Sequence, residues 1–442
     1  MPKPLPSSSP TFLQSNRVLA RVAKPVVDFL HIEASGGILL VCSTVAALVW
    51  ANSPFRASYD SFWHTPIELH IGTYEFAEDF GHVVNDLLMA VFFFVVGMEI
   101  KRELVVGELR NRRAVALPAF AALGGMIAPA ALYLAINANG DGGRGWGVPM
   151  ATDIAFALGV VALLGRRVPS TVKVLLLTIA IVDDIGAIIV IAIFYSEDLD
   201  FRFLAAAGGV AALIFVMHRV RVVYAPVFVI AGVVLWFAVF ESGIHATIAG
   251  VVMGLLTPAR PSQTELEAEE VIDVLEGRPD LRVDEVRATA VAVRGSVSAC
   301  DRQIDALHPW TSYFIVPVFA LANAGIELSA GAFSSPSKVF LGVGVGLVVG
   351  KLVGITLFSW IAVRLGLGRL PAHSNWRHLI GVAAMAGIGF TVSLFIGGLA
   401  FVNDDLEADA KIGTLVASVV AAVIGSLVFM LGRTQSTEPV DL

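Results

Sequence analysis

Long apolar stretches alternate with short polar connections along this chain. A membrane-spanning helix needs about 20 predominantly apolar residues, and the pattern predicts twelve apolar segments, of which the fourth and eighth are short and the ninth is borderline. They cover residues 35–51, 83–100, 114–136, 149–164, 172–195, 203–217, 223–240, 244–256, 311–328, 338–363, 379–401 and 411–431. We therefore predict an all-α membrane protein with twelve transmembrane helices embedded in a lipid bilayer, its transmembrane domain formed by residues 31–432.

The connections carry their basic residues on alternate sides. Lys and Arg precede the first segment and follow the second, fourth, sixth and tenth, whereas the connection SEDLD after the fifth segment has none. Because Lys and Arg are enriched in cytoplasmic loops, residues 1–30 and 433–442 are predicted to be cytoplasmic tails. The long acidic loop 258–306 is predicted to be cytoplasmic, and helical or partly disordered.

One outward connection shows the alternation of a β-strand. Ile67, Leu69 and Ile71 alternate with polar residues, and Tyr74 and Phe76 repeat the pattern after Gly72. Two such runs around a glycine predict a small β-hairpin on the outer face of the protein. A loop with chance alternation is the alternative, since the run is short.

Composition supports the membrane assignment and excludes several classes of function. The chain is 56% hydrophobic and 15% charged, with a mean hydropathy of +0.79, against about 25% charged residues in soluble proteins. It has no dense basic run, which argues against binding of nucleic acid. Cys42 and Cys300 form no CxxC motif and indicate neither a disulfide nor a thiolate metal site.

Two apolar segments contain residues that interrupt helices. The fourth (PMATDIAFALG) has Thr152 and Asp153 near its start, and the eleventh (AMAGIGFTVSLFIGG) has glycines and hydroxyl side chains at its centre. Each is the middle member of a group of three, segments three to five and ten to twelve. Because these groups are seven spans apart, they have opposite orientations, which predicts inverted-topology repeats with two crossed discontinuous helices. Tight packing of glycine-rich helices is the alternative interpretation.

Four ionisable residues fall within apolar segments. Asp183 and Asp184 are adjacent in the middle of segment five, Asp153 lies in segment four, and Lys351 lies in segment ten. Each charge at a bilayer centre costs at least about 2.5–3.5 kcal/mol, so such residues are usually functional. Lys351 can offset one carboxylate, which leaves another to hold a cation or a proton. We assign Asp183 to Lys351 and Asp184 to the ion, although the sequence leaves the reverse open, as it does a structural ion-pair cluster.

Other polar residues give weaker indications. Asp86, near the outer end of the second segment, either lines an ion vestibule or faces water. Glu99, Arg102 and Glu103 share one helix face at its inner end, either as a proton-sensitive cluster or as an ordinary helix end. His308 precedes Pro-Trp at the expected interface.

The motifs together resemble the NhaA family of bacterial Na⁺/H⁺ antiporters. The resemblance runs from about residue 30 to about residue 432 through NDLLMAVFFFVVGMEIKREL, ATDIAFALGV, TIAIVDDIGAIIVIAIFY, SGIHATIAGV, LHPW, FALANAGI, VVGKLVGI and GIGFTVSLFI. It implies a transporter of the bacterial inner membrane without a cofactor, not an enzyme. The implied activity is electrogenic, alkaline-activated exchange of Na⁺ or Li⁺ for protons, serving pH homeostasis and salt tolerance.

The resemblance also implies roles for individual residues. It carries the Na⁺ site onto Asp183 and Asp184, the polar groups of the crossed helices onto Thr152 and Asp153, and the intramembrane lysine onto Lys351. It matches Asp86 to the ion pathway, Glu99, Arg102, Glu103 and His308 to the pH-sensing region, and residues 59–76 to the contact of a homodimer. The chain departs from the family at Ile304 and Asp305, where a Glu–His pair is expected, which puts the pH threshold in doubt.

We expect Na⁺ and protons to compete for the same buried carboxylate, because Asp184 binds a cation only when deprotonated. Two other functions are considered. An intramembrane aspartyl protease needs its two aspartates on different helices, in YD and GxGD motifs. Here Asp183 and Asp184 are sequential on one helix, and neither lies in such a motif. A passive cation channel uses rings of side chains or backbone filters, whereas this chain shows an asymmetric buried cluster.

Overall fold

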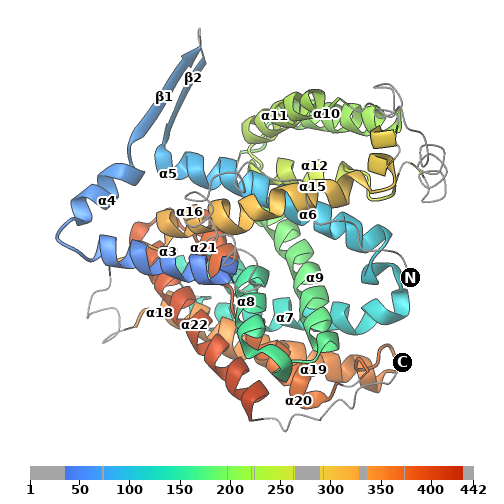
Figure 1. Cartoon of the computed structure of the whole chain (residues 1–442). Helices are drawn as coiled ribbons and strands as arrows, with labels where there is room; N and C mark the ends of the chain where they lie inside the picture. Colours follow the sequence, from blue (N-terminus) through green and yellow to red (C-terminus); the bar gives the residue numbers. More distant parts are fainter. Residues whose placement is uncertain are drawn as a thin grey trace, which may run out of the picture.

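The computed structural model is mostly helical, with a two-stranded sheet (Figure 1). It describes residues 35–431 apart from 72–73, 139, 197, 221, 223, 262, 264–288, 292, 328–335 and 373. The α-helices are α3 (Ser35–Ala51), α4 (Arg56–Trp63), α5 (Phe80–Val83), α6 (Met89–Val105), α7 (Arg112–Asn137), α8 (Ile154–Leu164), α9 (Ser170–Phe194), α10 (Phe201–Arg219), α11 (Ala225–Glu241), α12 (Thr247–Leu256), α15 (Ala299–Trp310), α16 (Val316–Asn323), α18 (Lys338–Val345), α19 (Lys351–Arg364), α20 (Trp376–Met385), α21 (Phe390–Ala400) and α22 (Asp404–Met430). The 3₁₀ turns are η2 (Glu108–Arg110), η3 (Asp141–Met150) and η4 (Gly165–Arg167), and the π-turns are η1 (Val84–Leu88), η5 (Thr311–Ile315) and η6 (Gly346–Gly350).

Many of these helices are long and apolar enough to cross a membrane. Among the described residues six pass this test, or nine if each of three bent pairs is one span. The bent pairs are α3 with α4, η3 with α8, and α20 with α21. This pattern is typical of a multi-pass membrane protein, and the total of twelve spans stays a prediction.

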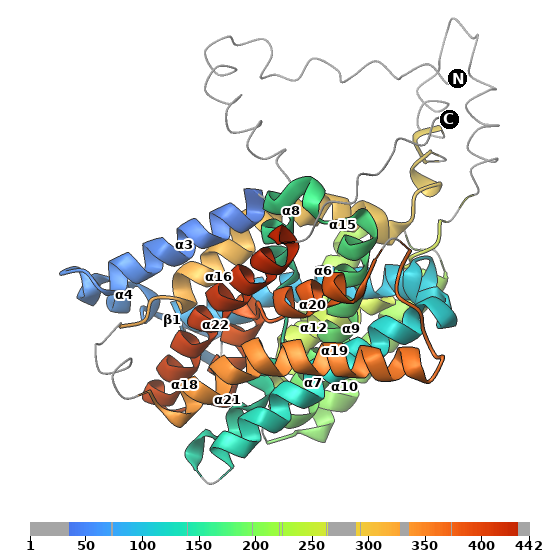
Figure 2. The ribbon, with the colours of Figure 1, turned by 90° about the horizontal axis from the view of Figure 1, so that it is seen from below.

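The two segments with predicted interruptions are indeed broken. Residues 151–153 separate η3 from α8 with a bend of 45°, and residues 386–389 separate α20 from α21 with a bend of 47°. A long helix precedes and another follows each break: α7 and α9 in the first group, α18–α19 and α22 in the second. Helices α7 and α19 pack against each other, so the two groups meet through their first members (Figure 2).

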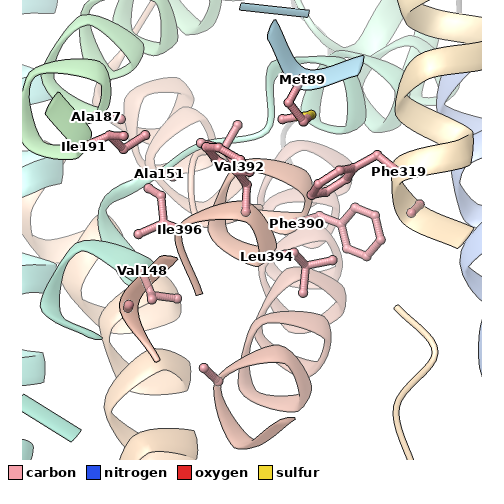
Figure 3. Close-up of a cluster of buried hydrophobic side chains, with 14 of the residues drawn as sticks. Met89, Val148, Ala151, Ala187, Ile191, Phe319, Phe390, Val392, Leu394 and Ile396 are labelled. Atoms are coloured by element: carbon pink, nitrogen blue, oxygen red, sulfur yellow. The ribbon is translucent and has the colours of Figure 1, made fainter. Parts of the chain in front are cut away.

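Helix α21 lies within the largest hydrophobic core. Figure 3 shows Phe390, Val392 and Ile396 of this helix with Met89 of α6 and Phe319 of α16 around them. All five side chains are buried. Because water cannot reach this core, the backbone groups freed at the neighbouring break must find partners within the protein.

The predicted β-hairpin is present. Strands β1 (Pro66–Ile71) and β2 (Tyr74–Asp79) pair antiparallel, with Leu69 opposite Phe76 and Ile71 opposite Tyr74. The hairpin projects away from the helices (Figure 1). The predicted turn residue Gly72 lies outside the described residues.

The acidic connection contains a helix at its carboxyl end. Helix α15 begins at Ala299, inside the range 258–306 that was predicted to be helical or partly disordered, and continues through η5 into α16. Its polar, amphipathic composition hides it from a search for apolar segments. The N-cap supplies a signal, because the Ser298 hydroxyl accepts the Asp301 N–H at 3.0 Å and Ser-x-x-Asp resembles a capping box. Most of the connection, 264–288, lies outside the described residues.

Candidate functional site

The two helix breaks are joined directly by hydrogen bonds. The Asp153 N–H donates to the Ile388 carbonyl at 2.6 Å, and the Ser393 hydroxyl donates to the Val148 carbonyl at 2.8 Å. The Thr152 hydroxyl lies 2.9 Å from the Ala386 carbonyl. Each break therefore provides hydrogen-bond partners for backbone groups that the other break leaves unpaired. These partners make non-helical backbone tolerable in the buried interior.

The side chain of Asp153 holds this junction together. One carboxylate oxygen accepts the Phe156 N–H at 2.9 Å and caps α8. The other accepts the backbone N–H and the hydroxyl of Thr391, at 3.0 and 2.6 Å. Both oxygens are thus occupied by protein donors, although sequence reasoning placed Asp153 among the ion-binding residues.

A buried ion pair lies beside the junction. The Lys351 ammonium is 2.5 Å from Asp183 Oδ2 and 2.9 Å from the Thr152 hydroxyl oxygen. That hydroxyl is itself 2.7 Å from Asp183 Oδ2, so its single proton serves either Asp183 or the Ala386 carbonyl. The exposed fractions of Lys351 and Asp183 are 0% and 2%. A buried charge without its partner is strongly destabilising, so each member of this pair requires the other.

Asp184 differs from its neighbour. Its side chain is 7% exposed, and within the described residues its carboxylate makes no hydrogen bond or ion pair with the protein. Asp183 Oδ1 is likewise buried without a hydrogen-bond partner in that part of the chain. The structure therefore pairs Lys351 with Asp183, the assignment that sequence reasoning favoured without fixing. It leaves Asp183 Oδ1 and the Asp184 carboxylate without a hydrogen-bond partner among the described residues.

Comparison with known proteins gives the chain its family. The model of the family described as Na⁺/H⁺ antiporter 1 matches residues 27–429, nearly the whole chain. The chain belongs to the Na⁺/H⁺ antiporter 1 family. A Na(+)/H(+) antiporter NhaA of Rhodopirellula baltica is 48% identical over 413 residues, covering 92% of this chain and 93% of that protein.

Two further relatives agree. A Na(+)/H(+) antiporter NhaA 3 of Frankia alni is 46% identical over 412 residues, covering 93% of this chain and 89% of its own length. A Na(+)/H(+) antiporter NhaA 2 of Myxococcus xanthus is 46% identical over 437 residues, covering 95% and 92%. The resemblance to the NhaA family is confirmed, and the chain is a multi-pass membrane protein of a transporter family.

The antiporter chain carries Asp86 in an irregular part of its helix. Asp86 is half-buried within the π-turn η1, and π-turns are frequent at functional sites. The preceding residue, Asn85, exchanges two side-chain hydrogen bonds with Asn323 of α16, at 2.7 and 3.3 Å. Sequence reasoning missed this amide pair, although two asparagines in otherwise apolar segments are a visible signal.

The residues expected to sense pH lie on α6 and α15. Glu99, Arg102 and Glu103 belong to α6, whereas His308 belongs to α15. Arg102 lies 3.8 Å from Glu103 and 4.0 Å from Asp301 of α15, and it lines one pocket together with His308. No hydrogen bond or ion pair within the described chain joins these side chains to the Lys351–Asp183 pair. Asp301 was not among the residues predicted for this region.

A buried thiol also connects α15 to α6. Cys300 donates to the Met98 carbonyl at 3.1 Å. Burial raises the pKa of the Cys300 thiol to about 11, so it stays protonated and unreactive at neutral pH. Cys300 is therefore a packing residue of the contact between α6 and α15.

Proposed function

We propose that this antiporter extrudes Na⁺, or Li⁺, from the cytoplasm in exchange for protons, and that the exchange is electrogenic and regulated by pH. The observation that carries the proposal is the buried Lys351–Asp183 pair beside Asp184, whose carboxylate has no protein partner among the described residues. An intramembrane carboxylate without a fixed counter-ion is suited to hold an exchangeable one.

Na⁺ and the proton compete for one site in this mechanism. Na⁺ is a hard cation that prefers oxygen ligands, and the free oxygens of Asp184 and Asp183 Oδ1 supply them. Deprotonated Asp184 binds Na⁺ from the cytoplasm, and protonation from outside displaces it.

The fold supplies the alternating access that exchange requires. In our proposal twelve spans form inverted-topology repeats, and the two broken helices cross at the site, so that one bundle moves against the other around it. The basic connections place both termini in the cytoplasm of a bacterial cell, with the protein in the inner membrane. This arrangement rests on the paired breaks and on the charge distribution of the loops.

Regulation and assembly complete the proposal. Asp86 belongs to the ion pathway, and Glu99, Arg102, Glu103 and His308 set the pH at which exchange begins, which serves pH homeostasis and salt tolerance. Residues 59–76 carry the contact of a homodimer, because they include a projecting strand and the helix at its base. Loss of the dimer on removal of the hairpin, measured by cross-linking in membranes, would support this assignment, and an unchanged dimer would exclude it.

Asp184→Asn tests the exchange mechanism. An amide cannot bind and release a proton near neutral pH, so we expect proteoliposomes with this variant to show no Na⁺-dependent proton flux. Asp404→Asn, at the exposed start of α22, is the matched control and should exchange normally. Normal exchange by Asp184→Asn would exclude the mechanism, and Na⁺ flux without proton flux in the unaltered protein would indicate a channel.

A further inference from the structure

Five side chains spaced four residues apart are all buried around Lys351. Val343, Leu347, Lys351, Ile355 and Ser359 have exposed fractions of 0%, 0%, 0%, 1% and 0%. In a regular α-helix each step of four residues turns about 40° beyond a full circle, so four steps would rotate this row by roughly 160°. A continuous α-helix would therefore turn the two ends of the row toward nearly opposite faces.

The π-turn η6 removes much of this drift. It spans Gly346–Gly350 and ends immediately before Lys351. A π-turn takes about one extra residue per turn, which sets the following helix back by roughly 100° relative to a continuous α-helix. The turn thus places Lys351 on the same buried face as Leu347 before it and Ile355 after it.

The two glycines that bound η6 each lie against a proline. A Cβ atom at Gly350 would lie 2.7 Å from the Cα atom of Pro129 in α7. A Cβ atom at Gly346 would lie 2.6 Å from the Cβ atom of Pro149, three residues before Thr152. A Cβ atom at Gly344, just before the π-turn, would have no such neighbour within 4 Å. The glycines on the buried side of this helix all lie close to a neighbour, since a Cβ atom at Gly342 or Gly354 would also lie within 2.3 Å of an atom of α7. Gly346 and Gly350 differ from these two because their contacts are with prolines at the π-turn itself.

These contacts set the distance between the helix of Lys351 and the elements facing it. The Lys351 ammonium reaches Asp183 at 2.5 Å and Thr152 at 2.9 Å, and hydrogen bonds weaken beyond about 3.2 Å. We propose that Gly346 and Gly350 are positioning residues for exchange, which hold the Lys351 ammonium against Asp183 and Thr152. Because these glycines have no side chain, the two prolines can pack directly against the helix backbone. This inference rests on the proposed function, because it concerns the counter-ion of the same site.

Single alanine substitutions test the inference. Gly346→Ala and Gly350→Ala should push the helix outward and loosen the ion pair. A looser ion pair stabilises the charged form of Asp183 less, so a proton competes with Na⁺ for the carboxylates up to a higher pH. The pH at which exchange reaches half its maximal rate should therefore rise by about half a unit or more. Lys351 should also become more reactive toward an amine-labelling reagent, read by peptide mass spectrometry. Gly344→Ala should change neither quantity.

A second substitution separates positioning from general packing. The two atoms nearest a methyl at Gly346 are the Cβ and Cγ atoms of Pro149. Pro149→Gly removes both and should restore the pH profile and the labelling of Gly346→Ala, whereas Pro149→Ala keeps the Cβ atom and should not. If Gly350→Ala fails to accumulate in the membrane, this pair of double variants decides the question.

Each result has one interpretation. If Gly346→Ala and Gly350→Ala unfold at lower temperature but label and titrate like Gly344→Ala, the glycines serve packing alone and the inference is wrong. If the unaltered protein shows no Na⁺-dependent proton flux, the exchange mechanism fails. The labelling of Lys351 still decides whether the glycines position it, because that measurement does not depend on transport.

Discussion

Asp153 shows how one side chain can join two broken helices. Its carboxylate caps α8 and also accepts two hydrogen bonds from Thr391 at the start of α21. A buried carboxylate with three donors is satisfied, whereas Asp184 has none among the described residues. At the scale of single residues, we therefore infer that Asp153 stabilises the junction, and we propose Asp184 as the residue that exchanges its partner.

Asp153→Ala should accordingly cost stability. It removes an N-cap, worth about 1 kcal/mol, and leaves buried donors of Thr391 unpaired, at about 1–3 kcal/mol. We expect a total loss of roughly 2–4 kcal/mol, measured as a lower unfolding temperature in detergent. Asp200→Ala is the control, since Asp200 caps α10 by accepting only the Arg202 N–H at a surface site. Equal losses for the two variants would contradict the joining role of Asp153.

At the scale of elements, the break between α20 and α21 depends on close backbone approach. A Cβ atom at Gly389 would lie 2.3 Å from the Ser393 hydroxyl oxygen, 2.8 Å from the side chain of Leu347 and 2.9 Å from the Ala151 carbonyl oxygen of the other break. Gly389→Ala should therefore separate the two breaks and lower the rate of exchange at least about tenfold, the effect of 1.4 kcal/mol. Gly397→Ala, later in α21, meets only Ala410 at 4.0 Å and should leave the rate unchanged. The rates are compared in proteoliposomes at equal protein content, and similar rates for both variants would refute the expectation.

Some of the helices, strands and breaks could be predicted from local sequence patterns, and others could not. The hairpin and both breaks were predictable, because strand alternation, glycines and buried hydroxyls are local signals. The position of α15 within a connection predicted to be helical or partly disordered was not, since a polar helix has no apolar run to mark its start. The π-turn η6 was not, since its helix is apolar on both sides. The pairing of Lys351 with Asp183 was favoured but left open, because adjacent residues on one helix point in directions about 100° apart and only the packed structure chooses between them.

At the scale of the whole molecule, our proposal gives exchange two sources of pH dependence. One is the carboxylate site, where we propose that protons compete with Na⁺. The other is the contact of α6 with α15, where Arg102 lies 4.0 Å from Asp301 and shares a pocket with His308. The chain has Ile304 and Asp305 where the resemblance implied a Glu–His pair, so we expect any change in the pH threshold to arise at this contact.

Exchange rates measured over a range of Na⁺ concentrations, up to saturation, separate these two sources of pH dependence. Competition for one carboxylate predicts that acidification raises the apparent KM for Na⁺, by up to about tenfold per pH unit, while the maximal rate stays constant, because enough Na⁺ displaces the proton. A regulatory change between α6 and α15 instead lowers the maximal rate whatever the Na⁺ concentration. We expect the unaltered protein to show the rise in KM, and Asp301→Asn to alter the maximal rate at acid pH but not the slope of KM against pH. A constant KM across the pH series would show that protons and Na⁺ do not share Asp184, and would move the origin of coupling away from the carboxylate pair.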